Sequence, residues 1–293
     1  MAPMHTEVLA AVPPAAAFLT FQRSVDARDA VTALGEIDLP EGVLVGIGAG
    51  LLDELGVAVP GVAVFPDLAA EGAKEAVPRT PVDVWVRVRG DDPGQVLHRM
   101  RALMAVMPEG LQLADRTDGF THDGGRDLTG YEDGTENPEP DEAPEVALAS
   151  GHGPGIDGGS VLVVQRWVHD FSRFEAMPKQ AQDHAIGRER VSNDELDDAP
   201  ESAHVKRTAQ EDFEPEAFLW RRSMPWSDHR GAGLVFVAFA ASVAPFMAQM
   251  RRMVGIDDGV VDALFQFTTP VTGAVVWCPP VVDGRLDLRV VSQ

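Results

Sequence analysis

Two segments of the chain, 150 residues apart, share one pattern of hydrophobic and polar positions. Across residues 82–88, valines alternate with other side chains as they do in a strand. Asp92 and Pro93 then offer a helix N-cap and a first-turn proline, and Gly110 follows the predicted helix. The apolar residues between them fall on one helical face: Val96, Leu97, Met100, Leu103, Met104 and Met107.

The second segment begins with an apolar run at residues 234–239, which predicts a buried strand. Residues 242–245 open a helix that Gly255 ends. Its apolar residues repeat the spacing of the first helix: Phe246, Met247, Met250, Met253 and Val254. Any two amphipathic helices can share such spacing, but here the preceding strand and the following glycine match as well. We therefore interpret the two segments as a structural duplication.

Each half also begins with a predicted strand, at residues 16–21 and 160–165, and a helical segment follows it. The order strand, helix, strand, strand, helix, strand is typical of a ferredoxin-like unit. The predicted fold class is α+β, with duplicated ferredoxin-like units and antiparallel sheets. The first unit is expected over residues 1–150 and the second over residues 151–293.

Two long stretches interrupt this pattern, at residues 119–159 and 188–215. Both are rich in polar residues, and the first is also rich in glycine and proline. We expect them to be irregular, and long loops in compact domains are usually functional or disordered.

Composition narrows the classes of function. The formal net charge is −22 over 293 residues, so the surface repels nucleic acids and anionic membranes. The single cysteine, Cys278, excludes an internal disulfide framework and a cysteine-based metal site within one chain. It lies in an apolar run, which predicts a buried, unreactive thiol.

The first 21 residues do not resemble an export signal. No Lys or Arg precedes the apolar stretch, and Pro13 and Pro14 interrupt it. No apolar run is long enough to span a bilayer. We therefore expect a cytoplasmic protein without a membrane partner.

Local chemistry alone singles out no active site. The segment Gly130–Pro138 reads GYEDGTENP, in which Asp133-Gly134 is an ordinary turn dipeptide. Its acidic residues lack the spacing of an EF-hand calcium loop. A lone histidine such as His204 is usually structural, and an arginine pair such as Arg221-Arg222 is usually a solvated charge.

Taken together, these segments resemble the dye-decolourising peroxidases, and in particular their bacterial cytoplasmic branch, called type B. The GxxDG pattern lies at residues 130–134, and the other similar segments follow in the family's order: 158–166, 169–170, 186–188, 202–207, 221–225 and 270–273. The resemblance is strong from about residue 119 to 273 and only general before that. The family's fold, a pair of ferredoxin-like units, agrees with the duplication.

The resemblance implies haem b, bound in the C-terminal half. It implies a peroxidase that reduces H2O2 through an oxoferryl state and oxidises small organic donors or dyes by single electrons. His204 matches the iron ligand and Asp133 the acid that moves the peroxide proton. Arg221 matches the arginine that stabilises developing negative charge. Its spacing of 17 residues from His204 favours it over Arg222, and strand alternation puts the two arginines on opposite faces.

Four further residues are candidates for holding the cofactor. Asp262 is the proposed acceptor for the second ring N–H of His204, or else it faces water at a helix start. Arg188 pairs with a haem propionate, or it only compensates a helix C-terminus. Asn137 fixes the loop against the haem edge, or it forms an Asx turn before Pro138. Gly134 lets the backbone approach the ligand closely.

Other functions stay open at this point. A haem carrier or sensor, or a protein that handles haem iron, would need His204 but neither Asp133 nor Arg221. A metal module that uses residues 122, 152 and 184 is disfavoured, because these histidines have no compact ligand spacing. Relatives form dimers or hexamers, so a homo-oligomer is implied, with peroxide and small electron donors as the other partners.

The sequence also departs from the family at one position and is poor in aromatic residues. Some members carry asparagine where Ser223 stands, so a peroxide contact from this position is in doubt. Four aromatic residues lie near the motifs: Tyr131, Trp167, Trp220 and Trp226. Such side chains can relay radicals, although core packing is the more usual role.

Overall fold

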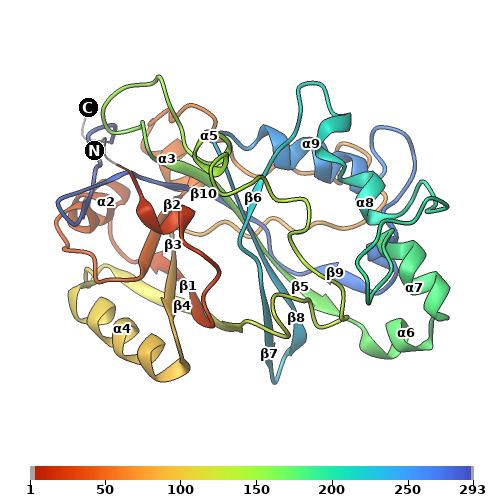
Figure 1. Cartoon of the computed structure of the whole chain (residues 1–293). Helices are drawn as coiled ribbons and strands as arrows, with labels where there is room; N and C mark the ends of the chain where they lie inside the picture. The colour runs from red at the N-terminus through yellow and green to blue at the C-terminus, as the bar shows by residue number, and fades with distance from the viewer. Residues whose placement is uncertain (1–3, 292–293) are drawn as a thin grey trace.

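The computed structural model describes residues 4–291 (Figure 1). In the N-terminal half, four antiparallel strands lie in the order β4-β1-β3-β2. They are β1 (Ala15–Arg23), β2 (Val43–Gly48), β3 (Val84–Gly90) and β4 (Leu111–Phe120). The helices of this half are α1 (Thr6–Leu9), α2 (Ala27–Gly35), α3 (Ala49–Glu54) and α4 (Pro93–Val106).

The C-terminal half repeats this arrangement with the order β10-β5-β8-β7. Its strands are β5 (Ser160–His169), β7 (Met224–Asp228), β8 (Gly231–Ala240) and β10 (Ala274–Cys278), with the shorter β6 (Trp220–Arg221) beside β8 and β9 (Thr268–Pro270) beside β5. The helices are α6 (Phe171–Ala176), α7 (Lys179–Ile186) and α9 (Ala244–Met253). In both halves a helix follows the first and the third strand, so the predicted ferredoxin-like duplication is confirmed.

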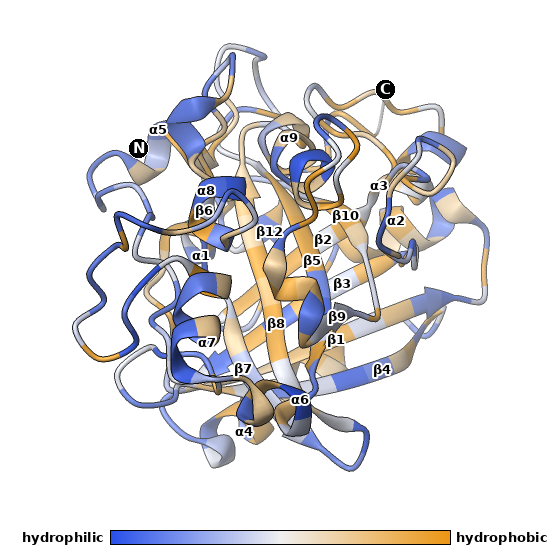
Figure 2. Ribbon diagram, turned by 90° about the vertical axis from the view of Figure 1, so that its right-hand side faces the viewer, coloured by the Kyte–Doolittle hydropathy of each residue, from blue (hydrophilic) through white to orange (hydrophobic). Residues whose placement is uncertain are grey.

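The two sheets join edge to edge. Gly119 of β4 lies opposite Trp226 of β7, and Gly48 and Ile47 of β2 lie opposite β10. Because β5 also pairs with β8, eight strands close into one barrel-like ring. Apolar strands occupy the centre of the molecule and polar loops surround them (Figure 2). The predicted boundary near residue 150 stays a prediction.

The two matched helices form where the hydrophobic pattern places them. Helix α4 begins at Pro93, and the Asp92 carboxylate accepts a hydrogen bond from the backbone N–H of Gln95 at 2.9 Å. One detail differs, because Leu97 and Met104 are 44% and 41% exposed. The buried face of α4 is therefore narrower than the face that its apolar residues form in the sequence pattern.

Strand β3 shows what alternation alone does not reveal. Its valines pack into one core, as expected, but Trp85 is buried in a second core on the opposite face and Arg87 is fully buried as well. The strand is part of the ring, between β1 and β2, and a hydrophobic core covers each of its faces. Cys278, at the end of β10, is buried as predicted.

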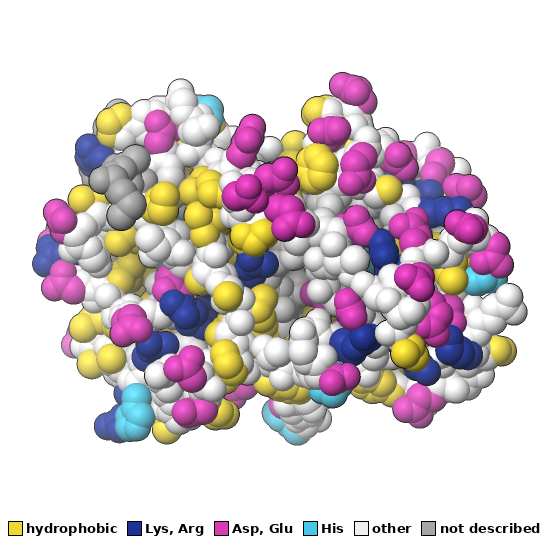
Figure 3. Space-filling model, viewed as in Figure 1, with side chains coloured by type: hydrophobic (Ala, Val, Ile, Leu, Met, Phe, Trp, Pro, Cys, Tyr) yellow, Lys and Arg dark blue, Asp and Glu magenta, His cyan; other side chains and the backbone are white. Residues whose placement is uncertain are grey.

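The two polar stretches were predicted to be irregular, but each contains short regular elements. They contain α5 (Ala143–Ala147), α8 (His204–Arg207) and the 3₁₀ turn η1 (Gln210–Asp212). The remaining short elements are η2 (Ala263–Gln266), β11 (Val281–Val282) and β12 (Arg285–Leu286). Acidic side chains are spread over the half of the surface that contains α7 and α8 (Figure 3). Within residues 4–291, no helix has the length and apolar character needed to cross a bilayer.

Buried His5 gives the fold a pH dependence. Its Nε2 accepts the backbone N–H of Val45 at 3.4 Å, and burial, aided by Arg87, lowers its pKa from 6.5 to about 3. Between those pH values the unfolded chain binds a proton that the folded chain does not. Stability should therefore fall as the pH falls from 6.5 toward 3, by up to about 1.4 kcal/mol per pH unit from this residue.

The measurement is the free energy of unfolding by urea between pH 7 and pH 4, in the wild type and in His5→Gln. Glutamine can still accept a hydrogen bond from the Val45 N–H but does not titrate. The plot of unfolding free energy against pH should therefore be less steep for His5→Gln, by up to the slope that one bound proton causes. Equal slopes for the two proteins would show that His5 is not the group responsible.

Candidate functional site

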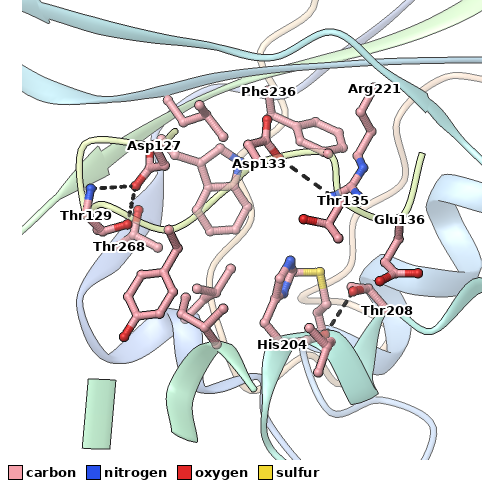
Figure 4. A pocket seen from close by; sticks show the side chains of 18 of the residues that line it. Asp127, Thr129, Asp133, Thr135, Glu136, His204, Thr208, Arg221, Phe236 and Thr268 are labelled. Atoms are coloured by element: carbon pink, nitrogen blue, oxygen red, sulfur yellow. Dashed lines mark hydrogen bonds and ion pairs between the residues drawn. The ribbon is translucent and has the colours of Figure 1, made fainter. Parts of the chain in front are cut away.

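A pocket opens in the C-terminal half between the sheet, α8, α9 and the loop around residue 133 (Figure 4). One set of its wall residues is apolar: Trp167, Leu234, Phe236, Phe246, Met250, Met253, Leu264 and Phe267. The polar wall residues include His204, Asp133 and Arg221. Three residues that are far apart in the sequence thus face one cavity.

His204 is the first residue of α8, and its ring is fixed from behind. Its Nδ1 lies 2.7 Å from Oδ2 of Asp262, which is 1% exposed. The other oxygen of Asp262 accepts the backbone N–H of Leu264 at 2.8 Å and caps η2. A carboxylate only accepts, so Nδ1 carries the ring proton and donates it. Nε2 is therefore the nitrogen whose lone pair is free for a ligand.

Asp133 and Arg221 lie on the side of the pocket opposite His204 (Figure 4). Arg221 is the last residue of β6, and Asp133 lies in the loop that Asn137 bonds to the Arg221 backbone. Arg221 Nη1 is 3.8 Å from Asp133 Oδ1, and the two side chains are 16% and 23% exposed. This ion pair is too long for a direct hydrogen bond, so the carboxylate and the guanidinium both keep hydrogen-bonding capacity for a small polar molecule that lies beside them.

Asn137 fastens the Asp133 loop to β6. Its Oδ1 accepts the backbone N–H of Arg221 at 2.8 Å, and its Nδ2 donates to the Arg221 carbonyl at 3.2 Å. Gly134, at φ +81°, makes this possible, because a Cβ there would lie 2.8 Å from Asn137 Nδ2. The side chain of Asn137 thus holds the backbone of Arg221, a contact that the sequence did not predict.

Arg188 also lies on the pocket wall, just after the Gly187 that ends α7. Its guanidinium pairs with Glu136 and, at 3.3 Å, with Glu195, and it donates to the Asn193 carbonyl at 2.9 Å. Its positive charge is therefore already shared with two carboxylates at the edge of the pocket.

Arg222 and Ser223 take no part in the cavity wall. The Arg222 guanidinium stacks on the Trp220 ring at 3.4 Å and donates to the Ala10 carbonyl at 3.1 Å. It thus leaves β6 on the face opposite to Arg221. Ser223 is buried, and its hydroxyl accepts the backbone N–H of Val237 at 3.3 Å.

A second polar group in the pocket wall was missed by sequence reasoning. His169 contacts Thr268 Oγ1 through Nδ1 at 2.7 Å and Asp127 Oδ1 through Nε2 at 3.0 Å. Burial alone would raise the pKa of Asp127, but hydrogen bonds from His169 and Thr129 hold it below its ordinary value. His169 lies in one of the segments that resemble the family, but no role was assigned to it. No sequence pattern indicated that Asp127 would lie beside it.

The alternative metal module finds no support in the structure. Among residues 4–291, no three His, Cys, Asp or Glu side chains gather as ligands for a metal ion, and this includes His122, His152 and His184. The structure instead places a histidine of fixed tautomer, His204, against broad apolar walls, an arrangement typical of proteins that hold a flat metal-containing cofactor through one axial ligand.

Comparisons with known proteins agree with this class. The family model for the N-terminal domain of Dyp-type peroxidases matches residues 4–121, and the model for the C-terminal domain matches residues 124–283. A dye-decolorizing peroxidase of Rhodococcus erythropolis is 29% identical over 243 residues, which cover 80% of this chain and 71% of the relative. The chain therefore belongs to the Dyp-type peroxidase family.

Solved structures extend the similarity to the whole fold. A dye-decolorizing protein from Vibrio cholerae is 27% identical, covers 98% of both chains and has a TM-score of 0.82. A variant of DypB from Rhodococcus jostii RHA1, solved in complex with haem, is 26% identical, covers 93% of this chain and 97% of its own, and has a TM-score of 0.82. The family and the peroxidase activity predicted from the sequence are confirmed.

Proposed function

We propose that the chain is a haem-dependent peroxidase in which His204 holds the iron, while Asp133 and Arg221 act on peroxide from the other side. The observation that supports it most strongly is the placement of these residues across one pocket (Figure 4). Haem b, when bound, would supply an iron porphyrin that can be oxidised by two electrons by peroxide and reduced again by donors one electron at a time.

The pocket fits this cofactor. Haem has two broad apolar faces and an edge that carries two carboxylates. The apolar wall residues suit the faces, and Nε2 of His204 is free to bind iron. Arg188 already pairs with Glu136 and Glu195, so a propionate would share the guanidinium with these two carboxylates. Its contact with Arg188 would therefore be weaker than an ion pair between the two groups alone.

Asp133 and Arg221 have separate tasks in peroxide cleavage. The Asp133 carboxylate takes the proton from one peroxide oxygen and returns it to the oxygen that leaves as water. The permanently charged guanidinium of Arg221 stabilises negative charge on that leaving oxygen. Asn137 holds Arg221 through its backbone, and Gly134 allows the loop to place Asp133 beside it.

A haem carrier or sensor would need His204 alone. The fixed geometry of Asp133 and Arg221 favours the peroxidase, because a carrier gains nothing from it. The test is to mix haem-loaded protein with peroxide in a stopped-flow spectrometer and then add a phenolic donor. A peroxidase shows a fast change of the Soret band and turns over the donor, whereas a carrier does neither.

Asp262 should tune haem binding through His204. Asp262→Asn keeps the size of the side chain and its ability to cap η2, but it removes the charge that the His204 N–H faces. Haem affinity should fall about 10–100-fold, as it does when such partners of a metal ligand are lost.

The measurement is a haem titration followed by absorbance. The matched control is Asp258→Asn, which weakens an ion pair with Arg207, the last residue of α8, but makes no contact with His204. Its affinity should stay close to that of the wild type. If both variants bind haem as tightly as the wild type, Asp262 has no role behind the ligand.

The family implies peroxide and small organic donors as the partners of the site. We further propose that the chain works in the cytoplasm as a homo-oligomer, either a dimer or a hexamer. Light scattering coupled to size-exclusion chromatography tests the oligomer, and a monomer at micromolar concentration would contradict it.

A further inference from the structure

The barrel-like ring of eight strands has an interior of its own, and side chains do not fill all of it. At one end α1 closes the ring, because Val8 is fully buried there and its carbonyl accepts the indole N–H of Trp220 at 3.2 Å. Further along the same strands lies a cavity of about 330 Å³, which we call the ring cavity. An eight-stranded barrel is just wide enough to enclose one small ligand, and barrel mouths are common places for binding sites.

The ring cavity is separate from the pocket that contains His204. The two lie on opposite faces of one sheet, since side chains alternate along its strands. On β5, Gln165 and Trp167 line the pocket, whereas Val164 and Arg166 line the ring cavity. The two sites have no lining residue in common. A ligand in the ring cavity therefore does not compete with the cofactor.

The floor of the ring cavity suits one flat apolar group. Its residues are buried and include Phe18, Trp85, Val164, Val235 and Ala274. The rings of Phe18 and Trp85 are stacked with their centres 5.9 Å apart. Exposed residues, among them Gln22 and Pro81, form the rim. Because a cavity of about 150 Å³ is enough for benzene, this one has room for an aromatic ring with a short substituent.

Arg166 places a cation on the wall of this apolar cavity. Its Nη1 donates to Asp115 Oδ2 at 3.0 Å and to Thr117 Oγ1 at 3.2 Å. Its Nε is buried and has no hydrogen-bond partner among residues 4–291. Such a donor is costly to leave unpaired, and a carboxylate is the acceptor that bonds most strongly to a guanidinium. The negative charge of Asp115 is also shared with Arg230, whose Nη1 donates to it at 2.7 Å.

We propose that the ring cavity binds a small aromatic carboxylate of about the size of benzoate. Its aromatic ring lies against the floor formed by Phe18 and Trp85, and its carboxylate accepts hydrogen bonds from Arg166. Asp115 does not prevent this, because two guanidiniums offset its charge. The site is independent of the proposed peroxidase function, since it shares no residue with the cofactor pocket.

The test is isothermal titration calorimetry of the haem-loaded protein with benzoate and with benzamide, which has nearly the same shape but no charge. We expect one benzoate per chain, bound about tenfold or more tightly than benzamide, because the bond to Arg166 is charge-assisted. The Soret band should not change. In crystals grown with 4-bromobenzoate, the anomalous scattering of bromine should place the ligand within the strand ring beside Trp85.

A pair of variants tests the role of Arg166. Arg166→Met keeps much of the length of the side chain but removes its charge and its donors, so benzoate should bind about tenfold or more weakly. Arg116→Met is the matched control, because it removes the same charge from an exposed pair with Asp118 and Arg116 does not line the cavity. Its affinity for benzoate should equal that of the wild type.

Three results would overturn the proposal. They are benzoate that does not bind or binds no better than benzamide, bromine that lies outside the ring cavity, and a folded Arg166→Met that binds benzoate as tightly as the wild type. The first two come from the wild-type protein, so they decide the matter even where Arg166→Met does not fold. None of these results changes the peroxidase assignment, which the reaction of the Soret band with peroxide tests separately.

Discussion

Replacing Asp133 by asparagine and Arg221 by leucine in the same protein should slow its reaction with peroxide by about 10²–10⁴-fold. The double variant loses the carboxylate that carries the proton and the cation that stabilises the leaving oxygen. Haem should still bind, because His204 lies on the opposite side of the pocket. The measurement is the second-order rate constant for the change of the Soret band after mixing with peroxide.

Arg222→Leu is the matched control for this experiment. It removes the same charge one residue further along, but Arg222 stacks on Trp220 and does not line the cavity. Its rate constant should stay near that of the wild type. A double variant that binds haem and still reacts at the wild-type rate would contradict the roles assigned to Asp133 and Arg221. If the double variant is slowed as expected, the two single variants show how the effect divides between the proton carrier and the cation.

Replacing His204 by alanine should have the largest effect on the cofactor. His204 is the side chain whose free nitrogen faces the pocket, and alanine offers no ligand in its place. Haem affinity should fall by more than the about 10–100-fold expected for Asp262→Asn, because that change leaves the ligand itself in place. The Soret band of the purified protein should be lost or strongly reduced.

His184→Ala is the control for His204→Ala. His184 belongs to α7 and lies 3.5 Å from Asp198, with 28% of its side chain exposed. The haem titration of this variant should match that of the wild type. If His204→Ala keeps the same Soret band and affinity, the iron is held by another residue.

Much of the fold follows from local patterns. The spacing of apolar residues and the Asp92 cap predict α4, and the same spacing predicts α9. The closure of the ring could not be predicted. It depends on Gly119 opposite Trp226 and on two residue pairs between β2 and β10. Alternation in a strand indicates which residues share a face, but it does not indicate which strand lies at the next edge.

Local patterns predict the site less well than the fold. His204, Asp133 and Arg221 stand out only through the resemblance to a family, because each is an ordinary residue in its own segment. The contact of Asn137 with Arg221 spans 84 residues, and that of Asp127 with His169 spans 42. Such pairs depend on how the chain folds back on itself. Arg188 was expected to meet the cofactor, and no pattern in the sequence indicated that Glu136 and Glu195 already share its charge.

The position of the iron tests the central claim most directly. Crystals of the haem-loaded protein, measured with X-rays at the iron absorption edge, locate that atom by its anomalous scattering. We predict one strong peak within bonding distance of His204 Nε2, with Asp133 and Arg221 on the opposite face of the haem. A peak bonded to any other residue, or Asp133 and Arg221 on the same face as His204, would contradict the account.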